Sequence, residues 1–100
     1  MLLEELILRY YGSYPASLQD VRDQHGNSLV GIAARNGDSS SLKLLLDCGL
    51  SPNTQDNQGN SPLHYALAGK SYPCTELLLE KGVDEDLRNY GGLTAWEVLP

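Results

Sequence analysis

Two runs of leucine dominate the hydrophobic pattern of this chain, Leu44-Leu45-Leu46 and Leu77-Leu78-Leu79. Each run is too apolar to face water, and a glycine follows each one three residues later, at Gly49 and Gly82. A shorter apolar segment with a glycine near its end precedes each run. The pattern therefore predicts two pairs of short helices, in which the second helix of each pair is the more apolar. The expected ranges are residues 29–36 and 40–48, then a helix ending near Gly69 and another starting at Pro73.

The same pattern repeats at a fixed interval. Shifting the sequence by 33 residues superimposes 23–55 on 56–88 without a gap, and nine of the 33 positions are identical. Average residue usage would give roughly two matches. Gly92 continues the series of Gly26 and Gly59, so a third copy starts with residue 89. This period is typical of stacked units, each of which covers the apolar face of its neighbour.

The amino-terminal end is irregular. Apolar residues recur at helical spacing between Leu2 and Tyr10, which predicts a helix over residues 1–11, and a longer loop is expected over residues 12–23. We interpret the whole chain as one domain. Its parts are a degenerate N-terminal capping repeat (1–22), two full repeats (23–55 and 56–88) and a partial C-terminal repeat (89–100).

Turn formers and helix caps separate the repeats. In the second copy, residues 56–60 are rich in Asp, Asn and Gly, Ser61 can cap the next helix, and Pro62 suits its first position. In the third copy, Thr94 and Glu97 have the spacing of a capping box.

Residues 59–66, Gly-Asn-Ser-Pro-Leu-His-Tyr-Ala, resemble the ankyrin signature Gly-x-Thr-Pro-Leu-His-x-Ala, and the Leu-Leu-Leu-x-x-Gly of the second helix follows. The resemblance covers residues 23–100 and implies an all-α ankyrin-repeat solenoid of helix-turn-helix units joined by turn or hairpin loops. Two departures stand out. The first copy has Leu29-Val30-Gly31 in place of Pro-Leu-His, and Lys70 replaces the usual glycine between the helices.

The resemblance also implies a function, the binding of another protein across the turn tips and the concave helix surface. The implied surface comprises Gln24, His25, Asn27, Arg35, Asn36, Asp38, Asn57, Gln58, Asn60, Ala68, Gly69, Ser71, Tyr72, Tyr90, Gly91 and Leu93. Among these, Tyr72 and Tyr90 are candidate anchors, because exposed tyrosine is frequent in interfaces. We expect an adaptor or an inhibitor whose partner the sequence does not name. The alternative is a regulatory ankyrin segment of a larger enzyme or channel.

The carboxyl-terminal repeat stops after the start of its first helix. We therefore expect part of the face behind Leu77, Leu78 and Trp96 to be exposed. Either the chain is part of a longer protein, or self-association or a partner covers that end.

Charge and composition narrow the class of partner. The net charge is −6, which argues against nucleic acid, because binding phosphates requires clustered Lys and Arg. Glu4, Glu5 and Arg9 interrupt the apolar start, so neither a signal peptide nor a membrane insertion is expected. Cys48 and Cys74 lack disulfide or zinc spacing, so we expect reduced thiols and an intracellular, cytoplasmic protein, with the nucleus left open.

Candidate chemistry is sparse. His64 occupies the histidine of the ankyrin signature, where the resemblance implies a structural hydrogen-bonding role, and His25 lies at a turn tip. No nucleophile motif surrounds the serines, and the acidic run at residues 84–86 lacks the alternation of an EF-hand loop. We therefore expect no catalytic residue, no metal and no cofactor, and we do not expect an enzyme.

Overall fold

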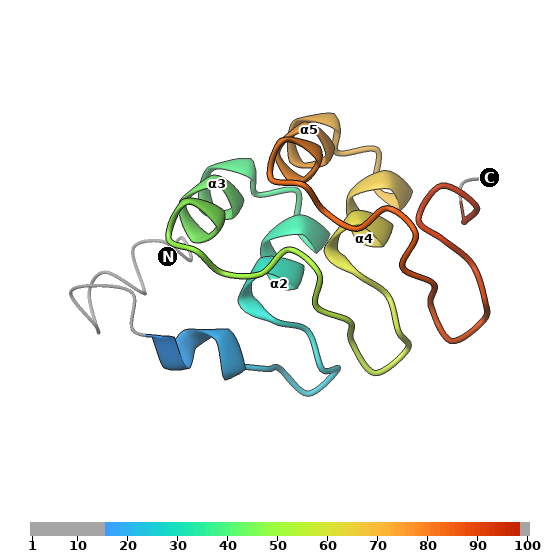
Figure 1. The fold of residues 1–100 in the computed structure, drawn as a ribbon, viewed down its shortest axis with the longest axis horizontal. Helices are drawn as coiled ribbons and strands as arrows, with labels where there is room; N and C mark the ends of the chain where they lie inside the picture. Colours follow the sequence, from blue (N-terminus) through green and yellow to red (C-terminus); the bar gives the residue numbers. More distant parts are fainter. Residues whose placement is uncertain (1–15, 99–100) are drawn as a thin grey trace.

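The structure, a computed structural model, describes residues 16–98. Within this range it contains a short 3₁₀ helix and four α-helices, and no strand beyond an isolated bridge between Arg88 and Thr94 (Figure 1). The elements are η1 (Ala16–Asp20), α2 (Leu29–Arg35), α3 (Ser39–Asp47), α4 (Pro62–Ala68) and α5 (Tyr72–Glu80). The predicted all-α fold is confirmed, and the helix bounds in the two full repeats differ from the predicted ones by a residue or so.

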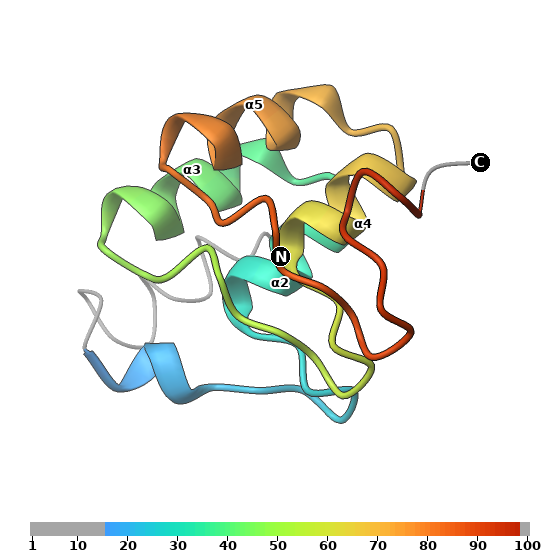
Figure 2. The same cartoon turned by 45° about the vertical axis from the view of Figure 1, so that its right-hand side comes forward.

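The helices pack in two layers. Within each repeat α2 packs on α3 and α4 packs on α5, and between repeats α2 packs on α4 and α3 on α5. Figures 1 and 2 show α2 and α4 side by side in one layer and α3 and α5 in the other. The long loops that join the repeats project from the α2–α4 layer on the side away from α3 and α5. This is the arrangement of a solenoid, in which each unit covers the next.

Side chains cap the amino ends of three of the four α-helices, α2, α3 and α4, and the sequence predicted the cap of α4. The Ser28 hydroxyl accepts from the amide of Gly31 at 3.0 Å, and Asp38 caps α3 by accepting from the amide of Ser41 at 3.1 Å. Ser61 caps α4, where Pro62 occupies the first helical position. These contacts satisfy amides that would otherwise lack a partner.

Two residues after the last residue of each α-helix, the backbone takes the left-handed conformation. Gly37, Gly49 and Gly82 have φ of 68°, 91° and 72°, and Lys70 takes the equivalent position with φ of 55°. After α4, the amide of Lys70 donates to Leu67 O at 3.1 Å, and the next amide, of Ser71, donates to Ala66 O at 2.8 Å. This pair of bonds defines a Schellman motif, in which a residue with a Cβ costs about 1 kcal/mol more than glycine.

Leucine and alanine side chains at matching positions of the two repeats form the core. Leu45 and Leu78 are equivalent in the two copies and are both fully buried, as are Ala33 and Ala66. Leu18 of η1 joins the same cluster, although the sequence predicted only a loop there. The predicted helix over residues 1–11 lies outside the described residues.

The carboxyl-terminal end of the described range departs from expectation in two ways. Leu78, which we expected behind an exposed face, is 0% exposed, because α3 and α4 both pack against α5. Leu77 is half-buried, whereas Trp96 is 45% exposed, so the expectation holds only in part. The second departure is that residues 95–98 form a turn and not the start of a helix. Half of the predicted capping box is present, because the Thr94 amide donates to Glu97 Oε1 at 3.0 Å.

Candidate protein-binding surface

Three loops, one from each repeat, form a row of tips along one edge of the molecule (Figure 2). Each loop starts with a side chain that holds its own backbone. Oδ1 of Asp23 accepts from the second and fourth amides that follow it, both at 2.9 Å, and Oδ1 of Asp56 does the same at the same distances. Asn89 repeats this geometry at 3.0 Å for both bonds. The loops therefore share one internally bonded conformation.

The loops also bond to one another. The Asn57 amide donates to His25 O, and the Tyr90 amide donates to Gln58 O, both at 3.0 Å. Because the two bonds are equivalent by the repeat, the second loop bonds to the first in the same way as the third bonds to the second. Ordering of the tips is thus already achieved in the unbound protein.

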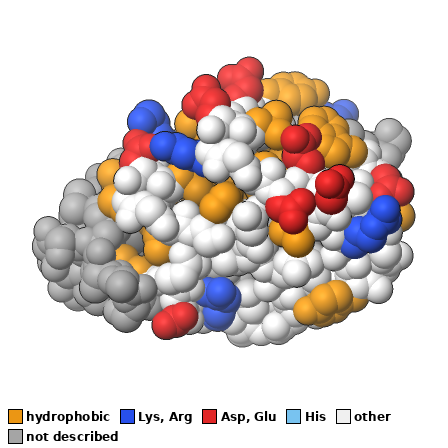
Figure 3. All heavy atoms as spheres, in the orientation of Figure 1, with side chains coloured by type: hydrophobic (Ala, Val, Ile, Leu, Met, Phe, Trp, Pro, Cys, Tyr) orange, Lys and Arg blue, Asp and Glu red, His pale blue; other side chains and the backbone are white. Residues whose placement is uncertain are grey.

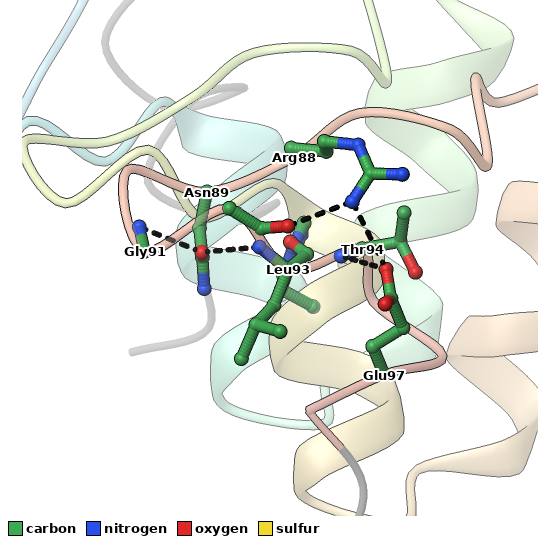
Figure 4. A network of polar contacts seen from close by, with 8 residues as sticks. Arg88, Asn89, Gly91, Leu93, Thr94 and Glu97 are labelled. Atoms are coloured by element: carbon green, nitrogen blue, oxygen red, sulfur yellow. Dashed lines mark hydrogen bonds and ion pairs between the residues drawn. The ribbon is translucent and has the colours of Figure 1, made fainter.

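The third loop has additional polar contacts (Figure 4). The Arg88 guanidinium donates to Gly92 O at 2.7 Å and pairs with Glu97 at 3.3 Å. The amide of Thr94 bonds to the same carboxylate, and these contacts lower the pKa of Glu97, with the Thr94 bonds as the main cause. Side-chain contacts therefore hold this loop although the described residues place no fourth repeat beside it.

His64 joins the second repeat to the third loop from inside the protein. Its Nδ1 accepts from the Ser61 amide at 3.1 Å and lies 2.8 Å from the Ser61 hydroxyl. Its Nε2 therefore carries the proton and donates to Leu93 O at 2.9 Å. The ring is 2% exposed, so the structural role implied by the ankyrin resemblance is confirmed.

A hollow of about 280 Å³ lies between the first two loops and the helices behind them. Its lining residues are His25, Arg35, Asp56, Asn57, Gln58 and Tyr65. The Tyr65 hydroxyl donates to Asp56 Oδ2, and the Arg35 guanidinium carbon lies 5.7 Å from the centre of the Tyr65 ring. Burial, and then the bond to Asp56, raise the pKa of Tyr65.

A family model described as ankyrin repeats (three copies) matches residues 2–89. The chain belongs to the ankyrin-repeat family. Ankyrin repeats are generally protein-interaction modules, and their stacked units present extended surfaces for binding.

Similar ankyrin repeats occur in several large proteins. The chain is 39% identical to human neurogenic locus notch homolog protein 2 over 80 residues, which is 79% of this chain and 3% of the relative. It is 46% identical over 72 residues to the E3 ubiquitin-protein ligase XBAT32 of Arabidopsis thaliana, covering 70% of this chain and 14% of that protein. The ADP-ribosylation factor GTPase-activating protein AGD4 of the same plant is 35% identical over 72 residues, covering 72% and 9%. The chain thus spans a small part of each relative.

Most of the predicted ankyrin surface is accessible. The exposed members are Gln24, His25, Arg35, Asn36, Asn57, Gln58, Ala68, Gly69, Tyr72, Tyr90, Gly91 and Leu93, and the half-buried ones are Asp38, Asn60 and Ser71. Tyr72 and Tyr90 are 64% and 75% exposed. Tyr90 lies at the tip of the third loop, whereas Tyr72 starts α5 and therefore belongs to the outer layer of ankyrin helices.

Asn27 was wrongly placed on this surface. It is 2% exposed, and its side-chain amide donates to Asp23 Oδ2 at 3.3 Å. The sequence predicted that this polar turn residue would be exposed, but its side chain is buried and bonds to Asp23 within the same loop. Asp38 and Asn60 are also partly engaged, the first as the cap of α3 and the second as an acceptor from Asn89 at 3.1 Å.

Sequence reasoning missed two residues of the hollow, Asp56 and Tyr65. The recurrence of aspartate at positions 23 and 56 marked the turn but gave no sign that the second carboxylate would meet a tyrosine nine positions later. Arg35, His25, Asn57 and Gln58 were all predicted.

Within residues 16–98, no group of three or more His, Cys, Asp or Glu side chains is arranged to hold a metal ion. None of the helices in that range has the length and apolar character needed to cross a bilayer. Cys48 and Cys74 are both free thiols, the first exposed and the second buried.

Proposed function

We propose that this chain is a docking module that binds another protein across the row of loop tips and the exposed sides of α2 and α4. The observation that carries the proposal is the backbone bonding between successive loops, in which Asn57 bonds to His25 and Tyr90 to Gln58. A surface ordered in advance loses little entropy when a partner docks. Gln24, Gln58 and Tyr90 on these loops are exposed and accessible to a partner.

Acting as an adaptor or an inhibitor requires no chemistry from this chain, and we propose that it binds without catalysing a reaction. Both ring nitrogens of the buried histidine, His64, already bond to Ser61 and Leu93. Such a residue holds the repeats together and has no free nitrogen with which to act as a general base. We also propose an intracellular location, which fits the free thiols of Cys48 and Cys74.

A second candidate is a regulatory ankyrin segment of a larger enzyme or channel. Two of the similar proteins carry the names of a GTPase-activating protein and a ubiquitin ligase, and the matched segment is 9% and 14% of their length. In that case the same surface would bind a domain of its own polypeptide or a substrate protein. The two candidates share the surface and differ in the partner.

A footprinting experiment tests the docking surface. The partner is first isolated from the native cell by affinity capture, and amide signals of the labelled chain are then followed by NMR as it is added. We expect the largest changes at the loop tips, around Gln58 and Tyr90, and on α2 and α4. Changes confined to α3 and α5 would contradict the proposal, because those helices form the opposite layer.

A further inference from the structure

We propose that the hollow between the first two loops binds a carboxylate side chain, Asp or Glu, of the partner protein and that Arg35 holds it. This inference rests on the proposed docking function and names the chemistry of one contact within it. The hollow is small, about 280 Å³, which suits one side chain of a docked protein better than an independent ligand of drug size.

Arg35 is already positioned for such a contact. It is the last residue of α2, it is exposed, and its guanidinium lies over the Tyr65 ring at 5.7 Å. Contact with an aromatic face uses the flat side of the guanidinium and leaves the N–H groups at its edge available. The ring thus limits the freedom of the arginine without consuming its hydrogen-bond donors.

Four of the other five cations in the described range are already engaged, and the fifth, Lys70, is exposed but does not line the hollow. Lys43 and Lys81 both pair with Asp47 at 2.7 Å, and Arg88 pairs with Glu97. Arg22 donates to two backbone carbonyls, at 2.6 and 2.8 Å. Within residues 16–98, Arg35 has neither an ion pair nor a hydrogen bond of its side chain. Its guanidinium is therefore available to an external acceptor.

The carboxylate of Asp56 lines the same hollow but does not satisfy Arg35. Its Oδ1 accepts two backbone amides at 2.9 Å, its Oδ2 accepts the Tyr65 hydroxyl, and the residue is only 6% exposed. These three donors occupy both carboxylate oxygens of Asp56 and hold them toward the protein. An incoming carboxylate therefore meets the Arg35 donors rather than the oxygens of Asp56.

The rest of the lining favours an acceptor group over an apolar one. Asn57 and Gln58 contribute exposed side-chain amides on one side, and His25 contributes an exposed ring on the other. A guanidinium can grip a carboxylate through two parallel N–H bonds, and neighbouring amides can donate to the remaining lone pairs. Arg35 gives this hollow a positive group on a chain whose net charge is −6, and an acidic partner residue would be attracted to that group.

The test uses selection from a displayed library of short random peptides on the full chain and on two variants, Arg35→Met and Lys70→Met. Each substitution removes one exposed cation, but only Arg35 lines the hollow, so the second variant controls for net charge. We expect wild type and Lys70→Met to select peptides with Asp or Glu at one position, and Arg35→Met to lose that preference. Thermal unfolding checks that all three proteins are folded.

A double-mutant cycle then assigns the contact. Changing the selected glutamate of the peptide to glutamine should weaken binding to wild type about tenfold and hardly alter binding to Arg35→Met. Equal losses on the two proteins, or no peptide whose binding requires Arg35, would overturn the carboxylate site. Peptides that are weakened by Tyr90→Ala but show no acid preference would overturn this site while leaving the docking function standing. If neither Arg35 nor Tyr90 matters, the docking function fails too.

Discussion

The amide nitrogen of Tyr90 lies so close to Gly59 that a Cβ on that glycine would approach it to 2.7 Å. Gly59 also has φ of +81°, and the neighbouring Gln58 carbonyl accepts the hydrogen bond from Tyr90. Gly26 stands in the same relation to Asn57 one repeat earlier. Two demands therefore meet at each glycine, a left-handed backbone and the close approach of the next loop.

Comparing substitutions at Gly59 and Gly92 separates the cost of the left-handed backbone from the cost of the close approach between loops. Gly92 has φ of +83°, but a Cβ added at this residue would have no neighbouring atom within 4 Å. We expect Gly92→Ala to lower the free energy of unfolding by about 1 kcal/mol, from backbone strain alone, and Gly59→Ala to lower it by about 3 kcal/mol because the Tyr90 loop must also move. Urea unfolding measures both. Equal losses would mean that contact between the loops contributes nothing.

Lys70 offers a stabilising change. Its φ of 55° is left-handed, and Gly37 holds the equivalent position in the first repeat with φ of 68°. Lys70→Gly should raise the free energy of unfolding by about 1 kcal/mol, and the reciprocal Gly37→Lys should lower it by a similar amount. Lys70→Ala is the control, since it shortens the side chain but keeps the strain. If Ala stabilised as much as Gly, the strain explanation would fail.

Removal of His64 should be costly. His64→Ala leaves the buried Ser61 amide without an acceptor and removes one of the two donors to the Leu93 carbonyl, which keeps only the Asn89 amide; we expect a loss of about 2–3 kcal/mol of unfolding free energy. His25→Ala, at an exposed turn tip, should change it by less than about 0.5 kcal/mol. Chemical unfolding compares the two. If His64→Ala lowered the free energy of unfolding as little as His25→Ala, the proposed role of His64 in joining the second repeat to the third loop would be contradicted.

Asp47 should make the stability of the protein depend on pH in the acid range. Hydrogen bonds from Lys43 and then Lys81 lower its pKa to about 2. Because its pKa in the folded protein lies below the ordinary value of about 4, Asp47 contributes stability above pH 4 that is lost as the pH falls through 2. Asp47→Asn should therefore lower the thermal midpoint at pH 7 and have little effect near pH 2. Glu76→Gln, which changes an exposed acid on α5, is the control. If Asp47→Asn lowered the thermal midpoint at pH 2 as much as at pH 7, the account would be contradicted.

Repetition explains why the helical framework could be read from the sequence. The leucine runs, the glycines after them and the Ser61-Pro62 start each specify a local structure and recur at one spacing. Leu18 and η1 escaped prediction because a single buried leucine carries no periodic signal. Asn27 was misplaced because the side chain of an asparagine in a turn can face either way, and only the position of Asp23 decides it.

The surface was partly predictable for the same reason. The position of a residue in the ankyrin repeat indicated which residues of the loops and first helices face outward, so Gln58 and Arg35 were found. The contact between Tyr65 and Asp56 depends on how α4 sits behind its loop, which residue types alone do not specify. On the face in Figure 3, acidic and apolar side chains are intermixed over the C-terminal half of the molecule, a distribution that composition alone also does not give.

Partner binding by a tyrosine variant tests the central claim, that the chain docks a protein through its ordered loops and first helices. Tyr90 is 75% exposed at the tip of the third loop, so replacing it with alanine should leave the thermal midpoint nearly unchanged. The affinity for the captured partner is then measured by titration calorimetry, with Glu76→Ala on the outer helix α5 as the control. We predict at least about a tenfold weaker complex for the Tyr90 variant and no change for the control. An unchanged affinity after the Tyr90 substitution would contradict the account.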